Sequence, residues 1–164
     1  MTITTKTGDN GYTSLWSGQR LRKDDIRVSS YGSIDELNSF LNEVKHYIQK
    51  DTNKLIIEQI QTVLKRVMGE LASIDKEHPT PIVESDIDYL EILINVFEKE
   101  NIIDDFADLG KTIASSKLDV CRTIVRRSER EIVKLAANEI ISELMISYMN
   151  RLSDLIFLMA ISES

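Results

Sequence analysis

The most distinctive residues of the sequence lie in one run, which reads Arg122-Thr-Ile-Val-Arg126-Arg127-Ser-Glu129-Arg130. A helix places Arg122, Arg126 and Glu129 on one face, because they are four and then three residues apart. One glutamate there can pair with two arginines. Arg127 and Arg130 crowd the same turn. Like charges one turn apart repel each other, and an anion that binds between them removes that cost. The run therefore predicts an anion site on a helix.

The same helix face also suits an interface between subunits, because arginine is favoured at protein interfaces as well as at phosphates. Carboxylates of a neighbouring subunit would then pair with the guanidinium groups. Both interpretations hold together if the anion site lies between subunits. Asn150 and Asp154 form a second polar pair, one turn apart in an otherwise apolar segment. If buried, this pair needs a partner, which either a ligand or another helix can supply.

A glycine-rich segment near the N-terminus carries a further set of anion-binding groups: Thr5-Lys6-Thr7-Gly8-Asp9-Asn10-Gly11-Tyr12-Thr13-Ser14. Glycines let backbone N–H groups turn inward, hydroxyls add donors and Lys6 adds charge, as a phosphate-binding loop requires. Lys23 offers a second cation for the same anion. An ordinary polar turn and a solvated lysine are the structural alternatives. The Gly-Lys-Ser/Thr ending of a Walker loop is absent.

Length and composition limit the class of protein. With 164 residues, 42% of them apolar and 29% charged, the chain predicts one soluble globular domain over residues 1–164. The net charge of −7 argues against nucleic-acid binding. No apolar run approaches the roughly 18 residues of a membrane helix, and the N-terminal Met-Thr-Ile-Thr-Thr-Lys has no apolar core of a signal peptide. One cysteine, Cys121, allows no internal disulfide. We expect a cytoplasmic protein with no membrane partner.

The apolar residues recur in steps of three and four, which predicts an all-α, five-helix bundle over 30–164, preceded by an N-terminal segment over 1–29. Ser33, with Glu36 three residues on, is typical of a capping box at the start of the first helix. The five predicted stripes are Ile34, Leu37, Leu41, Val44 and Ile48; Ile57, Ile60, Leu64, Val67, Leu71 and Ile74; Ile87, Leu90, Ile94 and Phe97; Leu118, Cys121, Val125, Ser128, Ile132 and Leu135; and Ile141, Met145, Tyr148, Leu152, Leu155 and Met159.

Helical bundles also hold di-iron carboxylate sites, which need Glu-x-x-His on two helices. Glu43-Val-Lys-His46 fits this pattern once. The other histidine, His78, stands beside a proline with Asp75 in place of the glutamate. We therefore expect no metal site made by protein ligands. Cys121 falls on an apolar stripe and is expected to be a small buried hydrophobe.

Four segments, in order along nearly the whole chain, resemble the PduO-type ATP:corrinoid (cob(I)alamin) adenosyltransferases. They are Thr5-Lys-Thr-Gly-Asp-x-Gly-x-Thr-Ser; Arg20 through Asp25 followed by Tyr31-Gly-x-x-Asp35-Glu-Leu-Asn38; Arg122-Thr-x-x-Arg126-Arg127-x-Glu129-Arg130; and Tyr148-x-Asn150-Arg151-Leu-Ser-Asp154. The resemblance implies a homotrimer of five-helix bundles with active sites between subunits. It implies transfer of the 5′-deoxyadenosyl group of ATP, with Mg²⁺ on the phosphates, to the cobalt of a reduced corrinoid. A reductase and an adenosylcobalamin-dependent enzyme are the partners expected.

The resemblance also implies roles for individual residues. The ATP-binding residues of the N-terminal segment would be Thr5, Lys6, Thr7, Gly8, Thr13, Ser14 and Lys23. Those contributed by the neighbouring bundle would be Arg126, Arg127, Glu129, Arg130 and Asn150. Arg122 and Asp35 would form an ion pair between subunits, beside the corrinoid. Phe106 would lie beneath the corrin ring, displace the lower axial ligand and exclude water. The expected catalytic residues are Asp35, Phe106, Arg122, Arg126 and Glu129.

Two features depart from the family pattern. Residues 107–112 replace an apolar loop that commonly contains Pro-Gly-Gly, and Asp119 stands where a histidine is frequent. The loop on the corrinoid side is therefore expected to differ in shape. A corrinoid and ATP carrier or sensor without turnover, and a purely structural trimer, are the alternative functions.

Overall fold

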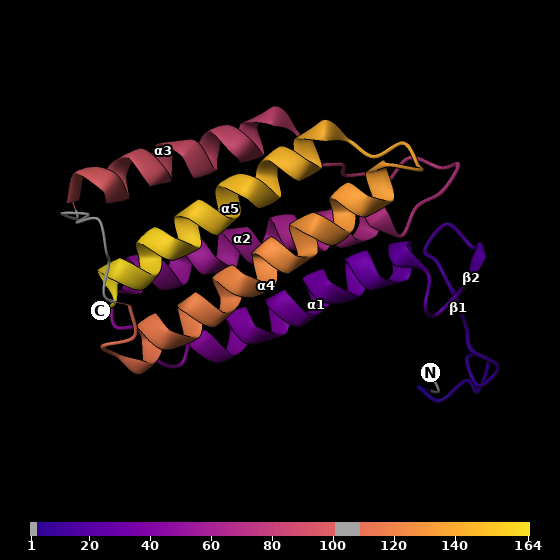
Figure 1. Cartoon of the computed structure of the whole chain (residues 1–164), viewed down its shortest axis with the longest axis horizontal. Helices are drawn as coiled ribbons and strands as arrows, with labels where there is room; N and C mark the ends of the chain where they lie inside the picture. Colours follow the sequence, from indigo (N-terminus) through magenta and orange to yellow (C-terminus); the bar gives the residue numbers. More distant parts are fainter. Residues whose placement is uncertain (1–2, 101–108) are drawn as a thin grey trace.

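The computed structural model describes residues 3–100 and 109–164, which form a bundle of five helices with a two-stranded sheet beyond one end (Figure 1). In chain order the elements are β1 (Tyr12–Ser14), β2 (Arg20–Arg22), α1 (Ile26–Val44), α2 (Asp51–Leu71), α3 (Glu84–Glu100), α4 (Ile113–Ala136) and α5 (Glu143–Ser162). The predicted all-α bundle is confirmed. The small hairpin of β1 and β2 is an element that helical periodicity could not indicate.

The apolar stripes form the core because each helix turns its stripe toward a neighbour. α4 packs against both α1 and α5, while α3 packs on α5 and α2 on α1. The α4 stripe is buried along its whole length, and Tyr148 of α5 is only 1% exposed. Three stripe residues, Ile74, Ile94 and Ile141, are only half-buried. Ile74 lies beyond the end of α2 at Leu71. The bundle is thus held by interdigitated apolar faces.

The first helix begins earlier than its sequence pattern predicted. Asp25 is the N-cap of α1: its backbone is extended, and its side chain accepts a hydrogen bond from the Arg27 N–H at 2.8 Å. Ser33 therefore lies inside α1, where its hydroxyl donates to the Ser30 carbonyl at 2.9 Å. The capping box predicted at Ser33 is wrong, because a serine within a helix can bond backward to its own chain instead of capping.

The last helix, α5, is more apolar than its sequence pattern predicted. α5 has a mean hydropathy of 1.4 over an 18-residue window, which meets the length and composition of a membrane-crossing helix. A core helix passes the same test, and 56% of that window is buried. Its buried residues include Met145, Leu152 and Met159, which belong to the common core. The apolar character of α5 is thus accounted for by packing within the bundle.

The N-terminus of α2 is capped by a side chain from the far end of the chain. The N-cap residue Lys50 makes no side-chain capping bond. Instead the carboxylate of Glu163, 4% exposed, accepts from the N–H groups of Gln49 and Lys50 at 3.0 and 3.3 Å and from Nδ2 of Asn53 at 2.7 Å. The Glu163 carbonyl accepts from the hydroxyl of Thr112, the N-cap of α4. One residue therefore joins the ends of three helices.

The hairpin lies next to the start of α1, beyond the bundle end (Figure 1). β1 and β2 pair in antiparallel fashion with Ser14 opposite Arg20. The N–H of Leu15 donates to the Gln19 carbonyl at 2.8 Å and closes the turn. Gly18 has a φ of 100°, a conformation that favours glycine. Leu15 is 5% exposed, so it anchors the turn to the body of the protein.

Candidate functional site

The N-terminal loop and the hairpin enclose a polar pocket of about 250 Å³. Its lining combines hydroxyls, a glycine and two cationic side chains: Thr5, Thr7, Gly8, Tyr12, Thr13, Ser14, Arg20 and Lys23. Of the residues predicted here, Lys6 alone does not line it. Lys6 has a positive φ of 58° at the bend of the loop, where its conformation shapes the backbone. The structure thus brings six of the seven predicted loop residues to one pocket, and phosphate binding there stays a prediction.

Hydrogen bonds from the hairpin hold the loop over this pocket. Arg20 donates to the Thr7 carbonyl at 2.9 Å, and the Lys23 N–H donates to the Gly11 carbonyl at 2.9 Å. A Cβ at Gly8 would lie 3.1 Å from Nζ of Lys23, so the ammonium group sits directly against that glycine. Arg20 was missed as a site residue. Its role depends on a hairpin of three-residue strands, which leaves no periodic signal.

The neighbouring cation, Arg22, is already neutralised. It forms two bonds to Asp24, Nε to Oδ1 at 2.8 Å and Nη2 to Oδ2 at 2.7 Å. The hydrogen bond from Arg22 holds the pKa of Asp24 below its ordinary value. Arg20 and Lys23 are therefore the cations of this segment that line the pocket, and Arg22 is not among them.

The arginine run lies on α4, and part of it is paired within the chain. Arg127 bonds Glu36 of α1, and Nε of Arg122 donates to Oδ1 of Asp119 at 2.8 Å. Glu129 accepts from Nδ2 of Asn150 on α5 at 3.2 Å. The prediction that Glu129 answers two arginines is wrong for the single chain, because no ion pair joins Glu129 to either within the described residues. The amide of Asn150 takes that place instead.

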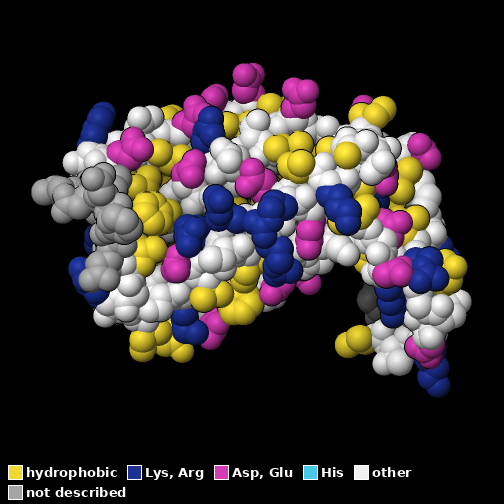
Figure 2. All heavy atoms as spheres, in the orientation of Figure 1, with side chains coloured by type: hydrophobic (Ala, Val, Ile, Leu, Met, Phe, Trp, Pro, Cys, Tyr) yellow, Lys and Arg dark blue, Asp and Glu magenta, His cyan; other side chains and the backbone are white. Residues whose placement is uncertain are grey.

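The other two arginines of the run, Arg126 and Arg130, are exposed and form no ion pair among residues 3–100 and 109–164. Both line a cavity of about 330 Å³ together with Glu129, Val133 and Asn150. Lys and Arg side chains gather over the middle of this face of the bundle (Figure 2). Two guanidinium groups that have no carboxylate partner in the described ranges, beside one carboxylate, leave a net positive cavity, which suits an anion.

A second cavity, of about 290 Å³, adjoins the first through Arg126, which lines both. Its lining adds three apolar side chains, Ile94, Phe157 and Leu158, to the polar residues Glu98, Arg122, Ser153 and Asp154. The predicted polar pair on α5 is thus divided, since Asn150 faces the arginine cavity and Asp154 faces this one. Arg126 therefore stands between a cavity suited to an anion and a cavity with an apolar wall.

Asp35 and Phe106 are two of the predicted catalytic residues. Asp35 is exposed on α1, and the described partner of Arg122 is Asp119, so the Asp35–Arg122 pair does not form within one chain. Phe106 lies outside the described residues. Cys121 is fully buried, and burial raises the pKa of its thiol to about 12, which fits the predicted packing role and not a reactive one.

The loop pocket and the two cavities lined by Arg126, which we call the arginine cavities, occupy different parts of one chain. The pocket lies at the hairpin, beyond the bundle end, whereas the cavities lie along α4 and α5 (Figure 1). Among the described residues, none lines both the loop pocket and an arginine cavity. A polyphosphate could therefore use both sets of cations if the loop of one chain meets the α4 face of another.

The sequence as a whole matches a known family. The model of the cobalamin adenosyltransferase family matches residues 3–163. The corrinoid adenosyltransferase PduO of Salmonella typhimurium is 37% identical over 99% of this chain, which spans about half the length of that relative. A PduO relative from Citrobacter freundii is also matched over half its length. A shorter corrinoid adenosyltransferase of Citrobacter freundii is 38% identical, with 96% of this chain and 92% of the relative covered.

Solved structures agree with this match. A variant PduO-type ATP:corrinoid adenosyltransferase from Lactobacillus reuteri, complexed with cobalamin and ATP, superposes with a TM-score of 0.91 at 35% identity. The superposition covers 97% of this chain and 89% of that one. A second variant of the same enzyme, complexed with ATP, gives a TM-score of 0.90 at 34% identity, covering 96% and 91%. By sequence and by fold, the chain belongs to the cobalamin adenosyltransferase family.

Proposed function

We propose that this chain transfers the 5′-deoxyadenosyl group of ATP to the cobalt of a reduced corrinoid. The substrate cobalt(I) attacks C5′ with its electron pair, a Co–C bond forms, and the C5′–O bond breaks. Triphosphate leaves with the electrons of that bond, and no phosphoryl group is transferred. The family membership and the ligands of the solved relatives support this reaction.

The observation that carries the proposal is the position of Arg126 between two cavities. One cavity offers Arg126 and Arg130 without ion-pair partners in the described part of the chain, as a polyphosphate requires. The other adds an apolar wall that includes Phe157 and Leu158, against which an apolar ring edge can pack. A residue shared by both cavities lies where nucleotide and acceptor would meet.

Electrostatics give the arginines their part in the reaction. Negative charge builds on the triphosphate as the C5′–O bond breaks, so cations fixed in advance stabilise the transition state more than the ground state. Arg126 and Arg130 would supply that charge from α4, and Lys23 from the loop. The hydrogen bond from Nδ2 of Asn150 to Glu129 fixes the orientation of both side chains in the lining of the arginine cavity. Orientation and exclusion of water complete what this protein needs to do.

Mg²⁺ would accompany the ATP phosphates. The described residues contain no group of three or more His, Cys, Asp or Glu side chains that could hold a metal. The hydroxyls of Thr5, Thr7, Thr13 and Ser14 fit a metal that arrives with its phosphates and keeps several waters. The ion would supply charge neutralisation, while the protein residues bind and orient the polyphosphate.

The active site is proposed to lie between subunits of a homotrimer, each subunit one domain over 1–164. This assembly would bring a loop pocket against the arginine cavities of a neighbour, and would let Asp35 reach Arg122 of another subunit. Phe106 is proposed to lie beneath the corrin ring. The reaction is proposed to be cytoplasmic, with a reductase supplying cobalt(I) and an adenosylcobalamin-dependent enzyme receiving the product.

An anaerobic visible-spectrum assay tests the reaction directly. Purified protein is mixed with chemically reduced cob(I)alamin and MgATP, and the cobalt(I) band is followed. Loss of that band, with growth of a light-sensitive adenosylcobalamin spectrum, is the expected result. No spectral change with intact ATP binding would instead indicate a carrier or sensor. No change and no ATP binding would leave only a structural bundle.

A further inference from the structure

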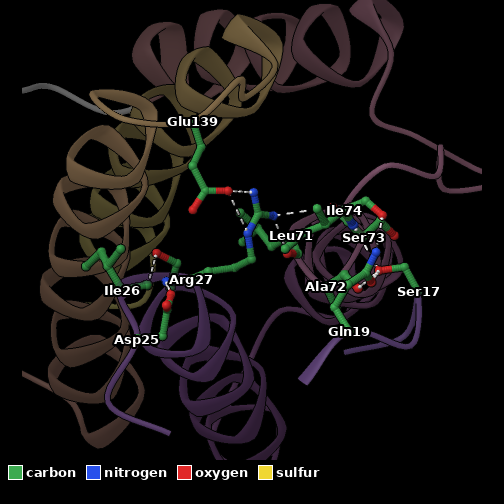
Figure 3. Close-up of polar contacts among 11 residues, drawn as sticks. Ser17, Gln19, Asp25, Ile26, Arg27, Leu71, Ala72, Ser73, Ile74 and Glu139 are labelled. Carbon is green, nitrogen blue, oxygen red and sulfur yellow. Dashed lines mark hydrogen bonds and ion pairs between the residues drawn. The ribbon is translucent and has the colours of Figure 1, made fainter. Parts of the chain in front are cut away.

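The turn of the β1–β2 hairpin is fastened to the chain segment that ends α2 (Figure 3). The N–H of Ser17 donates to the Ala72 carbonyl at 3.3 Å, and its hydroxyl accepts from the Ile74 N–H at 2.9 Å. Nε2 of Gln19 donates to the Ile74 carbonyl at 2.9 Å. We call these contacts of Ser17 and Gln19 with residues 72–74 the hairpin latch.

A buried arginine fastens the start of α1 to the same segment (Figure 3). Arg27, 4% exposed, donates from Nη1 to the carbonyls of Leu71 at 2.6 Å and Ser73 at 3.4 Å. Its Nε donates to Oε2 of Glu139, in the α4–α5 connection, at 3.1 Å. The last carbonyls of a helix have no partner within it, and a guanidinium there also faces the negative end of the helix dipole.

The latch matters because the hairpin is small and carries half of the loop pocket. Its strands of three residues each are too short to be stable alone. Ser14 and Arg20 flank the turn directly and line the pocket. Lys23 follows β2 and lies two residues before the N-cap Asp25, so Arg27 constrains that side. The position of the phosphate groups relative to the bundle is therefore set at residues 71–74.

We propose that Ser17, Gln19 and Arg27 are positioning residues for the ATP phosphates, acting through the hairpin without touching the nucleotide. This inference rests on the proposed function, because it assumes that the loop pocket binds ATP. A released hairpin must be ordered again whenever ATP binds, and that ordering weakens affinity. Once ATP is bound the reacting atoms meet as before. The effect therefore falls on KM for ATP and not on kcat.

The chain contains its own reporter of the latch. Its single tryptophan, Trp16, lies in the turn, 49% exposed. The Trp16 ring meets His78 edge-on, with ring centroids 5.3 Å apart, and Nζ of Lys76 lies 4.6 Å from its centroid. Both partners belong to the α2–α3 connection. Release of the turn removes these neighbours, so the emission of Trp16 should shift to the red.

The test is the double variant Ser17→Ala/Gln19→Ala, compared with Gln59→Ala/Thr62→Ala on the exposed face of α2. Trp16 emission, KM for ATP and kcat at saturating ATP are measured for the parent and both variants. The latch variant should show a red shift and roughly a tenfold higher KM for ATP, with kcat within about twofold. The control should match the parent in all three. The single variant Ser17→Thr, which keeps the hydroxyl and Gln19, should have the KM for ATP of the parent.

A second variant, Arg27→Lys, keeps the charge beside Glu139 but cannot span the same set of acceptors. It should raise KM for ATP in the same direction. An unchanged KM in the latch variant overturns the inference, whether or not the emission shifts, and so does a fall in kcat with KM unchanged. If the parent and the control neither bind nor turn over ATP, the proposed function itself fails. This outcome can be told from failure of the latch inference alone, in which the parent and the control remain active.

Discussion

Replacing Arg126 with alanine should leave the unliganded protein at least as stable as the parent. Arg126 is exposed, forms no ion pair in the described part of the chain, and has Arg122 and Arg130 one turn away on either side. Each like-charged pair at this spacing costs about 0.2–0.5 kcal/mol. Removing one member of both pairs relieves about 0.4–1 kcal/mol, which raises Tm by at most about 4 °C.

The same change should remove most of the stabilisation by MgATP. At 100 times its Kd, a ligand adds about 2.7 kcal/mol to the parent, or about 5–11 °C in Tm. Loss of one hydrogen bond to a charged group costs about 1.5–3 kcal/mol, which raises Kd about 10- to 100-fold. At an unchanged ATP concentration, the stabilisation of Arg126→Ala should therefore fall to about 0.4–1.4 kcal/mol.

Thermal unfolding with and without MgATP measures both effects in one experiment. Lys65→Ala, which removes an exposed cation from α2, is the matched control and should behave as the parent in both conditions. A parental ATP-dependent shift in Arg126→Ala would refute the assignment of the arginine cavity to the nucleotide. A fall of the unliganded Tm by more than about 4 °C would show that Arg126 is structural, and would refute the charge argument.

Two further substitutions and the properties of Cys121 test other parts of the structure. Gly8→Ala places a Cβ 3.1 Å from Nζ of Lys23, so the ammonium group must move. Titration calorimetry should then show a several-fold higher Kd for MgATP, while Tm stays unchanged. An affinity equal to that of the parent would contradict the pocket geometry. Glu163→Ala removes three hydrogen bonds and leaves the buried Asn53 amide without its acceptor. Urea unfolding should therefore show a free energy of unfolding lower by about 2–4 kcal/mol. A decrease below about 1 kcal/mol would contradict the capping role. Cys121, with its pKa raised to about 12, should resist iodoacetamide at pH 8 until the protein unfolds, and rapid native alkylation would contradict its burial. Because the native thiol keeps a proton that the unfolded thiol loses above its ordinary pKa of 9.0, Cys121 should also lower stability as pH rises from that value toward 12.

The helical framework could be predicted because burial on a helix face repeats along the sequence. The stripe from Leu118 to Leu135 is buried as predicted, and Cys121 within it is packed as a small hydrophobe. The residue that caps the start of α1 could not be predicted in this way. Both Asp25 and Ser33 are N-cap residue types, and only the conformation of the backbone distinguishes a cap from a serine inside a helix.

The partners of the charged side chains could not be predicted, because they depend on which residues the tertiary fold brings opposite one another. Arg127 bonds Glu36, which lies 91 positions away. Glu163 caps a helix that begins 112 positions before it (163 − 51). Periodicity records which face of a helix is buried, and it carries no information about the element that covers the face. The residues of the glycine-rich loop could be proposed as a group, by contrast, because its glycines and hydroxyls are neighbours in the sequence itself.

The separation of the loop pocket from the arginine cavities has a genetic consequence. If each site joins the loop of one subunit to the α4 face of the next, a chain with Lys23→Ala still offers an intact arginine cavity. A chain with Arg126→Ala still offers an intact loop. When the two assemble at random, about a quarter of the sites would combine both intact halves. Two alleles that are each inactive would then complement one another in the same cell, whereas one allele carrying both changes would complement neither.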